Sequence, residues 1–223
     1  MLKKISQKNL AGVLVSLFVF AVYLYTLSPA VTFGDSGDFV TVAYELGVSH
    51  PPGYPLHAII GHLFTKLPFG PVAWRVNLME AVFGVLAVFL VYQIIYKLTK
   101  NTWASAAGSL LLGFSSTFWT YCLVADVFAM NCFFTALMFY LLLVWRESLV
   151  KANSQGQKDT QPKFSILSAC ALIYGLSLTN HLTMVLLAPA FAYLILTTNW
   201  RIILKPKIII ACVLLFALGL TPY

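Results

Sequence analysis

The sequence predicts an all-α polytopic membrane protein with about seven transmembrane helices. Of its 223 residues, 60% are hydrophobic and 9% are charged, whereas a soluble domain carries roughly 25% charged residues. Apolar runs of about 15 to 20 residues recur from end to end, which suits a bilayer core of about 30 Å. The net charge of +7 comes from short basic clusters between these runs. It therefore indicates membrane topology and not a nucleic-acid partner.

The apolar segments follow one another along a single transmembrane module that covers residues 1–223. The first segment follows a lysine-rich N-terminus and is longer than the core of a cleaved signal peptide, so we interpret it as an uncleaved span. The fifth and sixth segments are separated only around Asn180 and His181, and they form either a tight hairpin or one interrupted unit. The predicted spans are 10–27, 76–96, 103–121, 127–145, 164–179, 183–198 and 207–223.

The distribution of basic residues places the N-terminus in the cytoplasm. In that orientation only Lys66 and Arg75 lie outside, as the positive-inside rule requires. All four histidines then lie at or near the outer face, with Asp35, Asp38, Glu45, Glu80 and Asp126. The pattern serves a bacterial plasma membrane and an endoplasmic reticulum alike, and we expect the former. The cytoplasmic clusters are Lys3/Lys4/Lys8, Lys97/Lys100, Arg146/Lys151/Lys158/Lys163 and Arg201/Lys205/Lys207.

The first outer loop, residues 28–75, is the longest outer connection and has the composition of an ordered segment. Its proline and glycine residues fix tight turns and allow close approach of the backbone to a ligand. Residues 36–46 and 56–66 are each predicted to form a short helix along the membrane surface. The cytoplasmic segment 151–163, in contrast, reads as a polar linker.

Asp35 and Asp38 stand three residues apart at the start of the first surface helix, and two interpretations remain open. Carboxylates stabilise a helix N-terminus, so both can serve as caps. Alternatively, one carboxylate in a partly dry pocket has a raised pKa and acts as a general base.

No metal site is predicted, because the sequence lacks known ligand patterns such as HExxH. His57 and His62 are five residues apart and do not share a helical face, although a carboxylate site with Asp35 or Asp38 stays open. His50 directly precedes a predicted turn at residues 51–55. The alternative to a ligand role for His50 is a hydrogen bond to this turn. We interpret the cysteines as small core residues; they are Cys122, Cys132, Cys170 and Cys212.

Four further polar residues lie at or near membrane depth. Arg75 either reaches toward lipid headgroups beside Trp74 or holds a lipid-linked phosphate with its planar donors. Asp126, Asn180 and His181 are candidates for function because polar groups are costly there. Helix–helix hydrogen bonding is their alternative role.

Six segments in this order resemble a known family. They are FGDSGDF at 33–39, AYELGV at 43–48, HPPGYP at 50–55, WRVN at 74–77, ADVFAMN at 125–131 and LTNH at 178–181. The chain resembles the bacterial membrane proteins related to the eukaryotic transmembrane O-mannosyltransferase of plexin-type immunoglobulin-like domains, which is a branch of the GT-C glycosyltransferases (glycosyltransferase family 117). The resemblance runs from about residue 10 to the last residue.

The resemblance implies a glycosyltransferase that uses a polyprenyl-phosphate-linked sugar as donor and no other cofactor. It implies that Asp35 is the leading catalytic carboxylate and that Asp38 is either its partner or a positioning group. His50, Tyr54, Asp126 and Asn180 then belong to the substrate-binding residues, and Arg75 and His181 are the candidates for contacting the departing phosphate. The acceptor is a protein or glycan outside the cytoplasm, for example a Ser or Thr hydroxyl.

The sequence departs from the family in three respects. The family usually has Glu at the positions of Asp38 and Asp126, so the shorter side chains alter reach. A second histidine is expected where Leu182 stands, which affects the role of His181. The superfamily normally has more spans, so we expect the chain to be an N-terminal catalytic portion.

A rival interpretation is a transporter or lipid-binding protein that uses the same outer cavity without chemistry. Transporters commonly place ionisable residues near the bilayer midplane and repeat the pattern in two halves. Here the polar residues gather at one face and no internal repeat is visible. The sequence therefore favours the enzyme.

Overall fold

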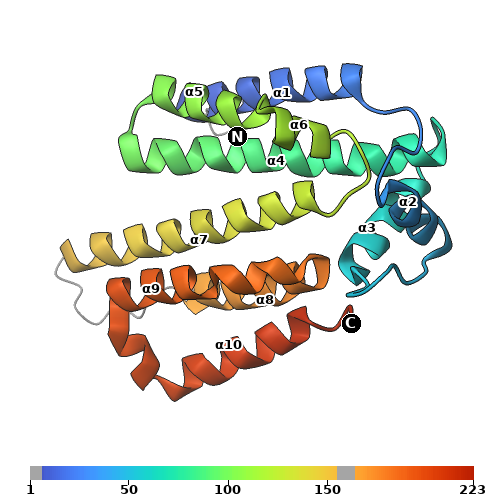
Figure 1. The fold of residues 1–223 in the computed structure, drawn as a ribbon. Coiled ribbons are helices and arrows are strands. Elements are labelled where there is room, and N and C mark those ends of the chain that lie inside the picture. Colours follow the sequence, from blue (N-terminus) through green and yellow to red (C-terminus); the bar gives the residue numbers. More distant parts are fainter. Residues whose placement is uncertain (1–6, 155–163) are drawn as a thin grey trace.

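The computed structural model describes residues 7–154 and 164–223, and these residues form helices and their connections without a strand (Figure 1). The all-α prediction is therefore confirmed. Most of the predicted linker 151–163 lies outside the described residues, as do the basic residues Lys3, Lys4, Lys158 and Lys163.

Among the described residues, four helical segments are long and apolar enough to cross a membrane, and each corresponds to a predicted span. Large apolar side chains such as Leu14, Phe18 and Leu214 are exposed on the bundle surface, where lipid solvates them at no cost. Two other predicted spans are the shorter apolar helices α8 (Phe164–Asn180) and α10 (Pro206–Gly219). The four long segments are α1 (Gln7–Thr26), α4 (Val72–Thr99), α7 (Phe128–Ser154), and the succession of η1 (Leu182–Leu187), α9 (Ala188–Asn199) and η2 (Trp200–Leu204).

The predicted continuous span 103–121 is wrong, because this segment forms two helices, α5 (Thr102–Gly113) and α6 (Ser116–Tyr121). Ser115 between them is extended, with φ −65° and ψ 133°. The hydroxyl of Tyr23 donates a hydrogen bond of 2.7 Å to the carbonyl of Gly113. This bond gives the carbonyl at the helix end a partner from α1, so the helix can end there without an unpaired buried group.

The helices pack around α4, which contacts α1, α5 and α7, while α8 joins the bundle through α7 and carries α10 on its other side. The α8–α10 contact is a backbone contact at Gly175 and Gly219. A Cβ atom on Gly175 would lie 2.3 Å from the carbonyl oxygen of Phe216, and one on Gly219 would lie 2.3 Å from that of Leu172. Small residues allow membrane helices to approach this closely.

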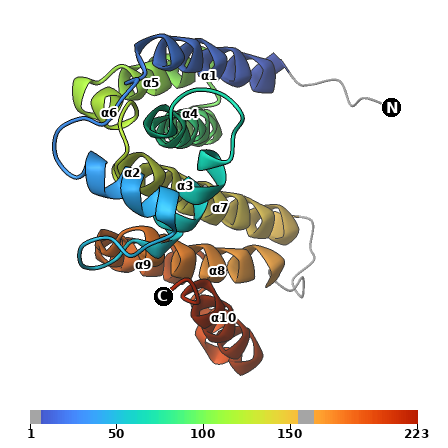
Figure 2. The same cartoon turned by 90° about the vertical axis from the view of Figure 1, so that its right-hand side faces the viewer.

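The two predicted surface helices are confirmed as α2 (Ser36–Glu45) and α3 (Pro55–Thr65). They lie across one end of the bundle, in front of the other helices in Figure 2. Gly34, with φ +74°, makes the turn that leads into α2, and Leu46 ends this helix in the left-handed conformation.

The opposite end of the bundle carries basic residues. Lys97, in the last turn of α4, forms an ion pair of 2.7 Å with Glu147 of α7. The histidines and the remaining described acidic residues lie toward the α2–α3 end. The two ends of the bundle therefore differ in their chemistry.

Candidate active site

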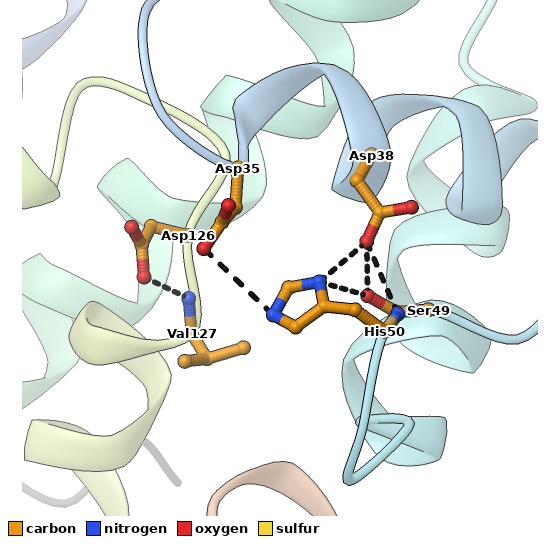
Figure 3. A network of polar contacts seen from close by, with 6 residues as sticks. All are labelled: Asp35, Asp38, Ser49, His50, Asp126 and Val127. Atoms are coloured by element: carbon orange, nitrogen blue, oxygen red, sulfur yellow. Dashed lines mark hydrogen bonds and ion pairs between the residues drawn. The ribbon is translucent and has the colours of Figure 1, made fainter.

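The candidate site lies at the end of the bundle where α2, the connection from α2 to α3, and the connection from α6 to α7 meet (Figure 3). Asp35 stands at the N-cap position of α2, but its side chain forms no capping hydrogen bond. The carboxylate is 64% exposed. Of the two interpretations left open by the sequence, the capping role is therefore not the one that the Asp35 side chain adopts.

Asp38, one turn into α2, is bound by several donors at one oxygen. Its Oδ2 accepts hydrogen bonds from the Ser49 hydroxyl, from the His50 backbone N–H at 3.4 Å and from His50 Nδ1 at 2.8 Å. Partial burial raises the pKa of the Asp38 carboxyl, but these hydrogen bonds outweigh burial and place the pKa below its ordinary value. Asp38 is thus held as a carboxylate.

His50 lies between the two aspartates, as Figure 3 shows. Its Nδ1 faces Asp38, and its Nε2 lies 3.7 Å from Oδ2 of Asp35. The structure therefore brings together three of the predicted site residues, which lie within sixteen positions of one another in the sequence.

Asp126, on the connection between α6 and α7, completes the acidic group. Its Oδ1 accepts a hydrogen bond of 2.7 Å from the backbone N–H of Val127. Burial raises the pKa of Asp126, and the charge of Asp35 contributes in the same direction. Two carboxylates from distant parts of the sequence thus face a shared region, in which a second negative charge is disfavoured.

A row of aromatic rings crosses the site. The Tyr54 ring lies 5.2 Å from that of His50 and 5.8 Å from that of His181, and His181 in turn lies 5.6 Å from Phe128. Burial and the charges of Asp35 and Asp126 raise the pKa of Tyr54, so its hydroxyl stays protonated and can donate a hydrogen bond.

His181 lies at the N-cap of η1 and is set in one tautomer. Its Nδ1 accepts a hydrogen bond of 3.1 Å from the backbone N–H of Thr183. Burial lowers the pKa of His181, which favours the neutral ring. Because Nδ1 is an acceptor, the proton of the neutral ring is on Nε2, which can donate to a ligand.

Two of the predicted binding residues are engaged by the protein itself. Asn180 is fully buried, and its Nδ2 donates to the carbonyl of Val127 at 3.2 Å, which ties α8 to the α6–α7 connection. Arg75 donates from Nε to the carbonyl of Gly70 at 3.0 Å and from Nη1 to that of Thr65. The guanidinium thus holds the end of α3 and the α3–α4 connection, and these contacts are not shared with the acidic group.

Two structural features beneath the site were not predicted from the sequence. Asn77 of α4 binds the carbonyls of Ser28 and Ala30 through Nδ2 and the N–H of Ala125 through Oδ1. His57 of α3 and Glu80 of α4 form a buried ion pair. Asn77 lies in the segment 74–77 that carries the family resemblance, which was the available signal.

The described residues contain no group of three or more His, Cys, Asp or Glu side chains that could hold a metal ion. The four cysteines are free, and all are buried or half-buried. Within the described part of the chain, the carboxylates of Asp35, Asp38 and the underlying Glu80 each contact a histidine and form no ion pair with lysine or arginine.

This fold and site define a polytopic α-helical membrane protein with an acidic and histidine-containing site at one end of its bundle. The model of the family "Protein O-mannosyl-transferase TMEM260 N-terminal domain" matches residues 35–203. The chain belongs to this family, as the resemblance predicted.

Curated relatives agree with this assignment. The chain is 31% identical over 228 residues to "Protein O-mannosyl-transferase tmem260" of Dictyostelium discoideum, an alignment that covers 99% of the chain and 28% of the relative. It is 33% identical over 213 residues to "Protein O-mannosyl-transferase TMEM260" of Mus musculus, with 92% of the chain and 28% of the relative covered. The chain thus spans less than a third of the length of these relatives. No solved structure matches it.

Proposed function

We propose that this chain forms the catalytic part of a GT-C-type glycosyltransferase, which moves a mannose-like sugar from a polyprenyl-phosphate carrier to a hydroxyl of a protein acceptor. Family membership supports the reaction class, because the relatives are named protein O-mannosyl-transferases. The observation that carries the proposal is the Asp35 carboxylate, which is exposed at the site and held next to His50.

Asp35 acts as the general base in an inverting displacement. The acceptor hydroxyl oxygen attacks the anomeric carbon while its proton passes to the Asp35 carboxylate. The bond between the anomeric carbon and the phosphate oxygen breaks, and its electron pair remains on the polyprenyl phosphate. Within the described residues no protein hydrogen bond satisfies the Asp35 carboxylate, so it is available to the acceptor.

The departing phosphate needs hydrogen-bond donors that are already in place. His181 supplies Nε2–H and Tyr54 supplies its hydroxyl; their rings are neighbours, 5.8 Å apart. Arg75 retains guanidinium N–H groups beyond the two that bind Thr65 and Gly70. Asp126 lies near Asp35, the proposed base (Figure 3). Its carboxyl group can therefore bind a hydroxyl of the sugar or of the acceptor.

The site faces the extracytoplasmic side in this proposal. The basic residues Lys97, Lys100, Arg201 and Lys205 lie toward the other end of the bundle, and basic residues stay in the cytoplasm. A bacterial plasma membrane remains our expectation for the location.

The test is transfer of radiolabelled mannose from polyprenyl-phosphate mannose to a protein acceptor in liposomes. Asp35→Asn keeps the size of the side chain and removes the base, so we expect a loss of roughly 10² to 10⁴ in rate with donor binding retained. Glu45→Gln, an exposed carboxylate at the other end of α2, is the matched control and should leave transfer unchanged. Equal rates for Asp35→Asn and wild type would remove Asp35 as base. Uptake of the lipid without transfer would support the transporter instead.

A further inference from the structure

The two aspartates of α2 have different surroundings. Asp38 receives the Ser49 hydroxyl and two N–H groups of His50 at a single oxygen. The nearest ion-pair contact of Asp35 among the described residues is with His50 Nε2 at 3.7 Å, which is beyond hydrogen-bond distance. Asp38 is thus hydrogen-bonded within the protein, whereas the Asp35 carboxylate is exposed at the site. His50 is the residue that links them.

The proton positions on His50 follow from these contacts. An ionised carboxylate only accepts hydrogen bonds, so the short contact to Asp38 requires a proton on Nδ1 of His50. In the neutral ring Nε2 then carries a lone pair, and it faces Oδ2 of Asp35. In this tautomer Nε2 and the Asp35 carboxylate are both acceptors, and no hydrogen bond joins them across 3.7 Å.

The relation changes once Asp35 has taken a proton. The Asp35 carboxyl group then has an O–H that can donate to Nε2 of His50, and proton transfer along this bond creates an imidazolium. The Asp38 carboxylate stabilises that positive charge through its contact with Nδ1. The interaction therefore strengthens as the acceptor loses its proton, which is the condition for lowering the barrier.

The neighbouring residues hold the His50 ring in this orientation. The ring centroid of Phe39 lies 5.6 Å from that of His50 in a tilted contact, and that of Tyr54 lies 5.2 Å away in a T-shaped contact. The titratable groups that face His50 are Asp35 and Asp38 on α2 and Tyr54 at the start of α3. The ring is 40% exposed, packs against Phe39 and Tyr54, and has a carboxylate near each nitrogen.

We propose that His50 is a proton-relay and positioning residue that acts through Asp35, with Asp38 orienting it, and that it does not bind the sugar directly. This inference rests on the proposed function. In the complete step the acceptor proton moves to Asp35 and on to Nε2, while the phosphate keeps the electron pair of the broken glycosidic bond.

Kinetics of three variants test the relay in the transfer assay. His50→Ala should lower kcat by about 10²-fold, with KM for donor and acceptor changed by less than about twofold. Asp38→Asn should cause a similar loss, and the double variant should lose no more than either single one, because both act in one unit. Added imidazole should restore part of the activity of His50→Ala.

His62→Ala is the matched control, since His62 links α3 to α2 through the carbonyl of Ala43 at 2.9 Å and has no ion pair with a carboxylate among the described residues. Its kcat should not respond to imidazole. A raised KM with unchanged kcat in His50→Ala would make His50 a substrate-binding residue, and additive losses with Asp38→Asn would overturn the relay.

A second readout does not depend on transfer. In ¹⁵N-histidine-labelled protein in detergent, the His50 signal, assigned by its absence in His50→Ala, should show a protonated Nδ1 and an unprotonated Nε2. Asp38→Asn should remove that preference. A resting His50 with the proton on Nε2 would overturn the relay even if wild type transfers sugar. Absence of transfer by wild type with the expected tautomer would count against the proposed function alone.

Discussion

His57 and Glu80 form an ion pair of 2.7 Å between α3 and α4, with side chains 1% and 0% exposed. The pair lies beneath the candidate site, and Glu80 Oε2 has no hydrogen-bond partner among the described residues. Because both side chains are buried, removing either one leaves the other without this hydrogen bond. The pair attaches α3 to α4 of the bundle, and thereby positions Tyr54, which is the N-cap residue of α3.

Removing one partner should therefore destabilise the protein strongly. We expect His57→Ala to lower the free energy of unfolding by about 3–5 kcal/mol, because Glu80 is left buried without a counterpart. Unfolding in detergent followed by circular dichroism measures this. The double variant His57→Leu with Glu80→Met replaces both groups by apolar side chains and should recover most of the loss. A single variant no less stable than the double one would contradict this account.

Asn77→Ala should reduce both stability and transfer. The change leaves the buried N–H of Ala125 without its acceptor and releases the carbonyls of Ser28 and Ala30, and each buried unpaired group costs about 1–3 kcal/mol. The matched control is Asn101→Ala, which removes the cap of α5 at the opposite end and costs about 1 kcal/mol. Equal transfer rates for the two variants at matched folding would show that Asn77 does not support the site.

Asp126→Asn should stabilise the protein near neutral pH. Since the pKa of Asp126 is raised by burial, ionisation is less favourable in the folded than in the unfolded state. This carboxyl therefore weakens the fold as pH rises from its unfolded pKa through its folded pKa. The gain in melting temperature of Asp126→Asn should vanish below about pH 4. An equal gain at all pH values would show that ionisation of Asp126 does not cause it.

Asp38→Asn should have the opposite sign. Because the pKa of Asp38 is lowered, its carboxylate contributes stability that is present above the unfolded pKa and is lost as pH falls through the folded pKa. The variant should melt below wild type at neutral pH, and the two should converge in acid. Melting temperatures of wild type, Asp38→Asn and the control Glu45→Gln, measured across pH, test this. A difference between Asp38→Asn and wild type that does not change with pH would contradict it.

Gly175→Ala should loosen the α8–α10 contact. The new methyl group meets the backbone carbonyl of Phe216, which cannot move aside without shifting a helix, so we expect a loss of about 1–3 kcal/mol. Gly108→Ala is the control, since its methyl group meets the terminal carbon of the Ile95 side chain, which can rotate. Comparable melting temperatures for both variants would argue against backbone contact between α8 and α10.

The sequence predicted the fold class and the two surface helices because hydrophobic runs and turn residues are local signals. It did not predict the break at Ser115, since the carbonyl of Gly113 is bound by Tyr23, 90 residues earlier. A contact of this kind depends on how α1 and α5 pack against each other, and the local sequence around Ser115 does not predict it.

The candidate site was predicted in part for the same reason. Asp35, Asp38 and His50 were identified by residue type and family resemblance, and the structure brings them together. The pairing of His57 with Glu80 was not identified, because it requires the relative rotation of α3 and α4 about their axes. The contacts of Arg75 with Thr65 and Gly70 likewise depend on the path of the α3–α4 connection.

Asn77 is a common anchor for two connections that are far apart in the sequence. Its side chain holds the backbone that leads to Asp35 through Ser28 and Ala30, and the backbone that leads to Asp126 through Ala125. A tilt or vertical displacement of α4 in the bilayer therefore carries both carboxylates in the same direction. The distance between the Asp35 and Asp126 carboxylates should therefore not change with such movements. A change in membrane thickness should shift the depth of the site and leave this distance unchanged.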